Sequence, residues 1–264
     1  MFELRHVTKI FNKGTPDEKI ALDDVSLKLE DGEFVTVIGG NGAGKSTMQN
    51  IISGAQMPDA GQVLLNGGDV THLPEHKRAK YLGRVYQDPM QGTAANMQIE
   101  ENLALANRRG QRRTLRPMIK KAEREQFKTQ LKELGLGLEE RMEAKVGTLS
   151  GGQRQALTLL MATLQKPQLL LLDEHTAALD PKTAAKVLEL TDRIVKEGQL
   201  TTLMITHNMR DAIDYGNRLI MLHEGRIILN IAGEEKKHLT VPQLLEQFTI
   251  ASGKEFSGDR AILS

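Results

Sequence analysis

Residues Phe34–Thr47 read FVTVIGGNGAGKST, and this stretch decides the fold. Its first residues, FVTVI, are apolar and mostly β-branched and predict a buried strand. The residues from Lys45 onward, KSTMQNIISG, predict a helix. The loop between them fits the pattern G-x-x-x-x-G-K-[ST], in which glycines let backbone amides wrap phosphate groups at a helix start. A strand, a glycine-rich loop and a helix in this order predict a site for a nucleoside triphosphate.

The side chains of this loop have distinct expected tasks. The Lys45 ammonium would reach the β- and γ-phosphate oxygens, and the Ser46 hydroxyl would bind Mg²⁺. The remaining loop residues expected to contact the nucleotide are Gly39, Asn41, Gly42, Ala43, Gly44 and Thr47. The alternative is a chance glycine-rich turn, and the strand before the loop and the helix after it argue against that alternative.

Further apolar runs alternate with helix-like segments along much of the chain. QLLLLDE (168–174) and LTTLMITH (200–207) are apolar without alternation, which is typical of strands buried on both faces. RLIMLHEGRIILN (218–230) predicts two strands joined by a tight turn at Glu224-Gly225. The expected fold is therefore α/β, with a P-loop NTPase core built on a mostly parallel sheet.

Two segments depart from this alternation. The N-terminal residues, including LRHVTKIF and ALDDVSLKLEDGE, predict an additional antiparallel β layer. The middle of the chain has little β character and predicts an inserted helical subdomain. The expected division is a nucleotide-binding core of residues 1–87 and 167–248, a helical subdomain of residues 88–166, and a mobile polar tail of residues 249–264.

Composition narrows the class of protein. Lys and Arg number 35 against 34 Asp and Glu, so the chain lacks the basic excess of a protein that coats nucleic acid. The absence of cysteine excludes disulfides and thiolate chemistry. The charged N-terminus has no apolar signal core, and the apolar runs are too short to span a bilayer. We expect a soluble, cytosolic chain that reaches a membrane only through a partner.

An acidic pair ends the leucine-rich strand. In an open parallel sheet this carboxyl edge is where ligands bind. Asp173 could hold Mg²⁺ there, directly or through water. Glu174 would point the other way in an extended chain and could act as general base toward a water. The alternative is a pair that only caps the strand, and the phosphate loop in the same chain favours the functional interpretation.

A second helix start also favours anions. In LSGGQ (149–153), Ser150 can accept a hydrogen bond from the first-turn amides, and Gly151 and Gly152 leave those amides uncovered. The positive end of the helix dipole would then face a ligand. One chain thus carries two phosphate-binding helix starts, which a single nucleotide bound to a single chain does not explain.

These motifs together resemble the ATP-binding cassette (ABC) ATPases. LSGGQ followed by LLLLDE resembles the signature motif and the Walker B strand of that family. Gln87 in RVYQDP matches the glutamine loop, ALD at 178–180 matches the D-loop, and His207 matches the switch histidine. Phe11 lies where the family stacks an aromatic ring, often tyrosine, on adenine. The resemblance extends over residues 2–233.

The resemblance implies a head-to-tail homodimer with two ATP molecules at its interface. The signature residues of one subunit, Ser150, Gly151, Gly152 and Gln153, would contact the ATP held by the partner's phosphate loop. Asp180 would couple the two sites. The two helix starts would thus be halves of one site.

Catalytic roles follow from the same resemblance. Ser46 and Gln87 would bind Mg²⁺ with support from Asp173. Glu174 would be the catalytic base, and His207 would bond the γ-phosphate and orient the attacking water. Lys45 would stabilise charge on the phosphates. His175 stands where many members carry proline, and we interpret it as a D-loop residue and not as a catalytic histidine.

A stand-alone cassette without membrane helices resembles the energising subunit of a bacterial importer. Integral membrane permease subunits are then the expected partners, and a solute-binding protein is a further one. Residues 86–106 lie where transporter cassettes receive the permease, which places the chain peripherally at the cytoplasmic face of the cell membrane. Amino acids or similar small solutes are the expected cargo. The alternatives are lipid or lipoprotein extraction and a mechanoenzyme on nucleic acid or ribosomes.

Only one stretch supports the last alternative. Residues 107–125, NRRGQRRTLRPMIKKAERE, are strongly basic and could contact nucleic acid or anionic lipid. Few aromatic residues lie among the arginines, so no base-stacking platform is present. We favour a solvated loop and helix start, and nucleic acid is not an expected partner.

Overall fold

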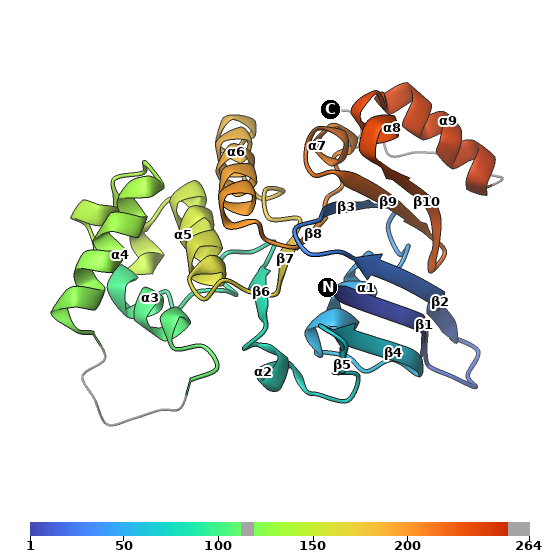
Figure 1. Ribbon diagram of the computed structural model, residues 1–264, viewed down its shortest axis with the longest axis horizontal. Coiled ribbons are helices and arrows are strands. Elements are labelled where there is room, and N and C mark those ends of the chain that lie inside the picture. The colour runs from blue at the N-terminus through green and yellow to red at the C-terminus, as the bar shows by residue number, and fades with distance from the viewer. Residues whose placement is uncertain (112–118, 253–264) are drawn as a thin grey trace. The chain divides into compact units, whose positions relative to one another are not determined.

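The computed structural model describes residues 1–111 and 119–252. The chain forms two compact units, the first comprising Met1–Arg78 and Gln199–Ser264 and the second comprising Ala79–Gly198 (Figure 1). The expected boundary after residue 166 differs from this division. The leucine-rich strand belongs to the second unit because it pairs with the strand at residues 82–85, which follows the first boundary.

The first unit contains an antiparallel layer with strand order β2-β1-β4-β5. Its strands are β1 (Phe2–Phe11), β2 (Lys19–Leu29), β4 (Ala60–Leu65) and β5 (Gly68–Asp69). The alternating apolar residues of β1 and β2 turn one face inward, so that Phe2, Leu4 and Val25 are buried. The predicted N-terminal β layer is confirmed, and β4 and β5 extend it beyond the segment from which it was predicted.

The same unit holds four strands in the order β10-β9-β3-β8. They are β3 (Phe34–Ile38), β8 (Thr202–Ile205), β9 (Arg218–His223) and β10 (Arg226–Ala232). β3 is parallel to β8 and β9, and every residue of β3 and β8 is buried, as their unbroken apolar character predicts. The antiparallel β9–β10 hairpin turns at Glu224-Gly225, as expected.

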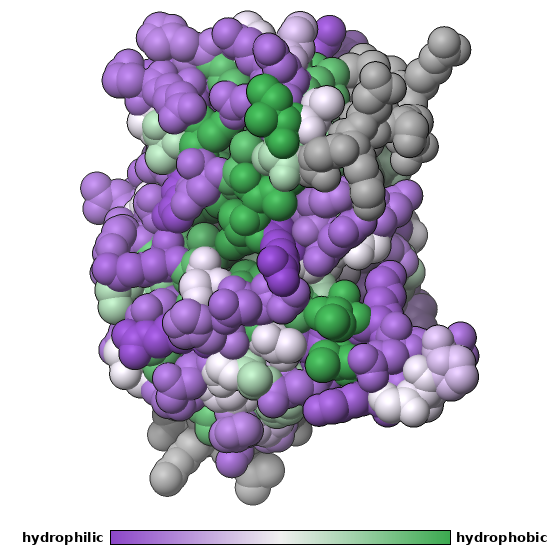
Figure 2. Space-filling view, turned by 90° about the vertical axis from the view of Figure 1, so that its right-hand side faces the viewer, coloured by the Kyte–Doolittle hydropathy of each residue, from purple (hydrophilic) through white to green (hydrophobic). Residues whose placement is uncertain are grey.

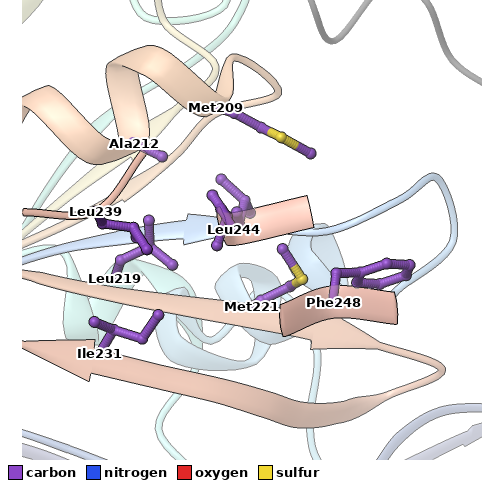
Figure 3. Packing of buried hydrophobic residues seen from close by; sticks show 9 residues of the cluster. Met209, Ala212, Leu219, Met221, Ile231, Leu239, Leu244 and Phe248 are labelled. Atoms are coloured by element: carbon purple, nitrogen blue, oxygen red, sulfur yellow. The ribbon is translucent and has the colours of Figure 1, made fainter. Parts of the chain in front are cut away.

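Five helices complete the described part of this unit. They are α1 (Lys45–Ser53), α2 (Glu75–Arg78), α7 (Met209–Asp214), α8 (Gly233–Lys237) and α9 (Val241–Ser252). A buried hydrophobic cluster packs α7 and α9 against the hairpin, and Figure 3 shows its members converging from these elements. Met209 and Ala212 come from α7, Leu219 and Met221 from β9, and Phe248 from α9. This packing fixes α7, which begins two residues after His207.

Figure 2 shows one face, on which hydrophobic residues gather in a band between hydrophilic ones. Among the helices within residues 1–111 and 119–252, none combines the length and apolar character needed to cross a bilayer.

The second unit pairs two parallel strands and surrounds them with helices. β6 (Leu82–Val85) and β7 (Leu169–Asp173) are in register, with Leu82 opposite Leu169. The described α-helices are α3 (Ile99–Asn107), α4 (Lys121–Glu133), α5 (Gly151–Thr163) and α6 (Pro181–Gly198). Two short 3-10 helices, η1 (Leu138–Glu140) and η2 (Val146–Thr148), lie between α4 and α5. The helical character predicted for the middle of the chain is therefore present.

Two predictions reach into parts of the chain outside the described residues. α9 continues to Ser252, so the first four residues of the predicted tail are helical, and residues 253–264 lie outside the described part. Arg112, Arg113 and Arg116 of the basic stretch also lie outside it. Three described arginines of this stretch have protein partners: Arg108 pairs with Glu123 at 2.9 Å, Arg109 donates to the Ala162 carbonyl, and Arg124 pairs with Glu100 at 2.6 Å. Burial lowers the pKa of Arg109.

Candidate functional site

The phosphate loop of the first unit has the backbone shape that its glycines predict. Gly39, Gly42 and Gly44 have φ of 153°, 77° and 105°, values that side-chain-bearing residues rarely adopt. Gly44 is the N-cap of α1 and provides no side-chain cap, so no capping side chain occupies the first-turn amides of the helix. These amides form an anion site at the positive end of the helix dipole.

Lys45 lies inside this loop. Its side chain is 5% exposed, and its ammonium donates to the Gly39 and Gly40 carbonyls at 2.7 and 3.1 Å. The ammonium is therefore held where the loop encloses phosphate oxygens. Ser46 and Asn41 are exposed, whereas Ala43 is buried beneath the loop. Thr47 is half-buried in the first turn.

The phosphate loop packs against the β9–β10 hairpin and against β2. The sequence pattern did not predict this contact. A Cβ on Gly39 would lie 2.3 Å from the Leu222 carbonyl oxygen, and one on Gly44 would lie 2.5 Å from the Ala21 carbonyl oxygen. Gly225 donates its amide to the Ala43 carbonyl at 3.1 Å. The loop can pack this closely because residues 39 and 44 are glycines. The partner segments are distant in sequence, so no local pattern predicts the contact.

The first unit also carries Phe11 and His207. Phe11 ends β1, is half-buried, and has the Lys9 ammonium 5.7 Å from its ring centroid. His207 is half-buried in the short connection from β8 to α7. The next residue, Asn208, caps α7 by accepting hydrogen bonds from the Arg210 and Asp211 amides. His207 is thus held between a buried strand and a capped helix.

The second unit carries the acidic pair. Asp173 ends β7 and lies 3.8 Å from a guanidinium nitrogen of Arg84 on the paired strand β6. Glu174 has φ of 44°, so the extended backbone expected at this residue is wrong: the chain turns sharply directly after the strand. A positive φ at a glutamate is uncommon, and it places Glu174 in a tight turn directly after β7. Both carboxylates are half-buried, as acidic groups that meet a ligand would be.

Gln87 and its neighbours follow β6. Gln87 is exposed, and the preceding Tyr86 lies under the Arg84 guanidinium, 4.6 Å from its carbon to the ring centroid. The buried Gln155 of α5 donates its side-chain amide to the Tyr86 carbonyl at 3.2 Å. The segment that carries Gln87 is therefore tied to the same helix that begins at the signature residues.

Ser150 caps α5 as predicted. Its hydroxyl accepts a hydrogen bond from the Gln153 amide at 3.3 Å, and the Gln153 side chain accepts from the Ser150 amide at 3.2 Å. Ser150 and Gly151 are exposed, which leaves this side of the helix start open to an anion. Gly152 is different and corrects our expectation: it is buried, and a Cβ there would lie 2.3 Å from Thr183 Cγ2 on α6. Gly152 is needed for helix packing.

Asp180 and His175 stand in the turn between β7 and α6. Asp180 accepts the Thr183 amide at 3.1 Å and so caps α6 ahead of Pro181, and hydrogen bonds from Thr183 lower the pKa of Asp180. His175 is 2% exposed and bonds Thr191 at 3.0 Å, while burial lowers its pKa to about 4. A neutral, enclosed histidine fits the structural role assigned to it.

The residues predicted to hold Mg²⁺ supply only oxygen donors. They are the Ser46 hydroxyl on the first unit and the Gln87 amide and Asp173 carboxylate on the second. A hydroxyl, an amide oxygen and one carboxylate suit Mg²⁺, which keeps water and phosphate oxygens as its other ligands. Each of these groups, taken by itself, is therefore of the chemical type that Mg²⁺ prefers.

Comparison with known proteins extends this assignment. The model of the family described as ABC transporter matches residues 22–177. A protein of Clostridioides difficile named tyrosine transport ATP-binding protein is 45% identical over 251 residues, which cover 95% of this chain and all of that protein. A methionine import ATP-binding protein of Corynebacterium efficiens is 35% identical over 233 residues, 86% of this chain, but the match spans 61% of that protein's length.

Solved structures agree with these sequence matches. The dimeric structure of the ATP-binding cassette MJ0796, in a post-hydrolysis state with ADP and Pi, is 30% identical with a TM-score of 0.74. The match covers 88% of this chain and 98% of that one. The ADP conformation of the cassette MJ1267 is 26% identical with a TM-score of 0.76, covering 94% and 98% of the two chains. The chain therefore belongs to the ABC transporter family, as one of its ATP-binding subunits, and it is an ATPase.

Proposed function

We propose that the chain hydrolyses ATP to drive import of tyrosine, or of a chemically similar amino acid, through separate membrane permease subunits. The observation that carries the proposal is the 45% identity to a tyrosine transport ATP-binding protein, which this chain matches over that protein's whole length. Relatives named for methionine and for spermidine/putrescine import support small-solute import more broadly.

In the proposed reaction the oxygen of a water attacks the γ-phosphorus, and the bond to the β–γ bridging oxygen breaks. Lys45 and the loop amides hold the β- and γ-phosphates and stabilise the charge that spreads over them. Glu174 accepts the proton of the attacking water, and the sharp turn after β7 sets where its carboxylate points. His207 bonds the γ-phosphate and orients the water, while Phe11 stacks on adenine.

Ser46, Gln87 and Asp173 would hold Mg²⁺, which when bound neutralises charge on the β- and γ-phosphates. Gln87 adjoins the proposed helical subdomain of residues 88–166. Because Gln155 ties α5 to the segment before Gln87, a change at Gln87 can be transmitted to the signature helix.

The proposed assembly is a homodimer in which two copies lie head to tail and enclose two ATP molecules. The exposed start of α5, with Ser150, Gly151 and Gln153, would contact the γ-phosphate held by the partner's loop. Gly152 would set the packing of this helix, and Asp180 would couple the two sites from the start of α6. The cassette MJ0796, solved as a dimer, supports this arrangement.

The remaining partners follow from the proposed transport. Permease subunits would receive the segment 86–106, where Met90 is 41% exposed on the surface, and a solute-binding protein would deliver the amino acid. The chain would then lie at the cytoplasmic face of the cell membrane. This position is compatible with the lack of a membrane-spanning helix in the described residues.

Uptake of labelled tyrosine by cells that make this chain tests the substrate. Replacing Lys45 with Ala should abolish ATP-dependent uptake, and excess unlabelled tyrosine should compete with the label whereas spermidine should not. Uptake of tyrosine that is unchanged in the Lys45→Ala cells would overturn the proposed substrate.

Capture of partners from solubilised native membranes tests the transporter role itself. Tagged Glu174→Gln protein with ATP should recover a polytopic membrane protein, together with a solute-binding protein. Recovery of ribosomal proteins or nucleic acid without any membrane protein would contradict the role in transport. Recovery of a lipoprotein-extracting membrane complex would instead contradict amino-acid import.

A further inference from the structure

We propose that Lys19 is a further nucleotide-binding residue, whose ammonium contacts a phosphate of the bound ATP. The inference concerns recognition of the nucleotide and does not depend on which solute is transported. Lys19 belongs to none of the motifs used above, and the register and packing of β2 carry the argument.

The first observation is the position of the side chain. A Cβ built on Gly42 would lie 3.3 Å from the Lys19 ammonium, so the ammonium lies beside the exposed part of the phosphate loop. Gly42 has a left-handed backbone and no side chain that could separate this cation from a bound phosphate. The ammonium is therefore next to the loop surface that surrounds the nucleotide.

The second observation is how firmly β2 is held against the loop. Ala21 follows Lys19 by two residues, and its carbonyl oxygen lies 2.5 Å from the position of a Cβ built on Gly44. Further along, the Asp23 amide donates to the Gly225 carbonyl at 2.9 Å, and Gly225 donates to the loop at Ala43. These contacts hold β2 beside the phosphate loop, although the β1–β2 register is irregular at Ala21, and Lys19 lies on the same strand.

The third observation is the register with the adenine-stacking residue. Lys19 is paired with Phe11 across the β1–β2 ladder. If the adenine stacks on Phe11 and the phosphates enter the loop, the nucleotide runs from the Phe11 end of this pair toward Gly42. The Lys19 backbone then lies opposite Phe11, and its ammonium extends to Gly42, where the negatively charged phosphates would lie.

Charge supports the same assignment. Lys45 is enclosed by the loop and bonded to two carbonyls, whereas Lys19 is exposed, and among the described residues it forms no ion pair with a carboxylate. An ammonium next to an oxyanion site forms a charge-assisted hydrogen bond when a phosphate oxygen arrives. Because the side chain is exposed, solvent and salt screen this contact, so its contribution is modest.

The test compares equilibrium binding of ATP, ADP and adenosine by the purified full chain without Mg²⁺, so that no hydrolysis occurs. Lys19→Met should weaken ATP binding by about three- to tenfold at low salt, a range expected of one screened charged contact. Adenosine binding should be unchanged, and the loss for ATP should shrink as salt rises. Lys19→Arg should bind ATP nearly as well as the wild type.

Lys28→Met is the matched control, because Lys28 is an exposed lysine at the opposite end of the same strand, where it pairs with Glu30. It should bind ATP as the wild type does. If Lys19→Met and Lys28→Met lose the same ATP affinity, the effect comes from the change in net charge, and the proposal is overturned. Wild-type ATP affinity in Lys19→Met, or an equal loss for adenosine, would overturn it as well.

Discussion

Glu174 shows how a single backbone conformation can serve chemistry. The residue directly follows β7, and its φ of 44° turns the chain at the point where the strand ends. A carboxylate on such a turn is aimed by the backbone, in the way that residues at active-site turns commonly are. Asp173, one residue earlier, remains on the strand beside Arg84. Two adjacent carboxylates therefore have different backbone settings, which suits the two different tasks proposed for them.

Glu174→Gln should retain ATP affinity and lose hydrolysis. Removing the general base should reduce kcat by about 100- to 10,000-fold, because proton transfer in the transition state contributes that much. The measurement is phosphate release at saturating ATP, alongside equilibrium ATP binding. Asp192→Asn, which changes a half-buried acid on α6 that pairs with Lys196, provides the control and should leave both unchanged. Hydrolysis by Glu174→Gln at the wild-type rate would refute the assignment of the base.

Gly152 should be intolerant of even one added methyl group. A Cβ at this position meets Thr183 Cγ2 at 2.3 Å, so Gly152→Ala must push α5 and α6 apart. Overpacking of this kind costs about 1 to 3 kcal/mol of the free energy of unfolding. The neighbouring Gly151→Ala meets only the end of the Leu179 side chain, at 3.2 Å, and should unfold at nearly the wild-type denaturant concentration. Equal denaturation midpoints for Gly151→Ala and Gly152→Ala would show that the contact between residue 152 and Thr183 does not limit stability.

Among the elements, α1 is closed at its C-terminus by a buried arginine. Arg78 is 1% exposed and donates to the Ile51 and Ile52 carbonyls of α1, and also to the Leu73 and Thr71 carbonyls. Burial lowers the pKa of Arg78 to about 10, so it remains charged at neutral pH. The helix that begins at the phosphate loop is thereby held at its far end as well.

Arg78→Met should lower the free energy of unfolding by about 3 to 5 kcal/mol, because it removes a buried cation that donates hydrogen bonds to four backbone carbonyls. Arg78→Lys should lower the free energy of unfolding by less than Arg78→Met does, since an ammonium can still reach some of these oxygens. Chemical denaturation of both variants gives the measurement. A Met variant as stable as the wild type would mean that the carbonyls find other donors.

α7, the helix after His207, is closed by Lys236. The Lys236 ammonium is buried and donates to the Ile213, Tyr215 and Gly216 carbonyls at 2.8, 2.6 and 3.0 Å. Burial lowers its pKa to about 8 from an ordinary value of 10.5. Between these two values the unfolded chain binds more protons than the folded one, so stability from this group rises with pH.

The free energy of unfolding of the wild type, minus that of Lys236→Met, should therefore increase between about pH 8 and 10.5. The pKa difference sets an upper limit of about 3 kcal/mol for this increase. Subtracting the free energy measured for Lys236→Met removes the contribution of the other lysines and of the tyrosines, which titrate in the same pH range. A difference that is constant over this range would show that Lys236 titrates normally.

The sequence predicted those elements whose pattern is local. FVTVI and LLLLD form buried strands because continuous apolar runs leave no polar face, and the phosphate loop forms because its glycines permit its φ values. The support of that loop by Gly225 was not predicted, because it depends on packing between distant segments. The turn at Glu174 was missed since glutamate rarely adopts a positive φ.

For the molecule as a whole, the candidate site residues are distributed over the two compact units. Lys45 and His207 belong to the first unit, whereas Ser150 and Glu174 belong to the second. In the described residues, α1 of the first unit begins after Gly44 without a side-chain cap, and α5 of the second unit begins after Ser150 at exposed residues. The central claim is that two copies of the chain combine these helix starts into shared ATP sites.

Sedimentation of purified Glu174→Gln protein with saturating ATP and Mg²⁺ tests this claim most directly. The account predicts an ATP-dependent dimer, and it predicts that adding Gly151→Asp returns the protein to a monomer that still binds ATP. An aspartate at this exposed helix start leaves the fold intact but repels the partner's γ-phosphate. A monomer with ATP bound, or a dimer that Gly151→Asp leaves unchanged, would contradict the claim.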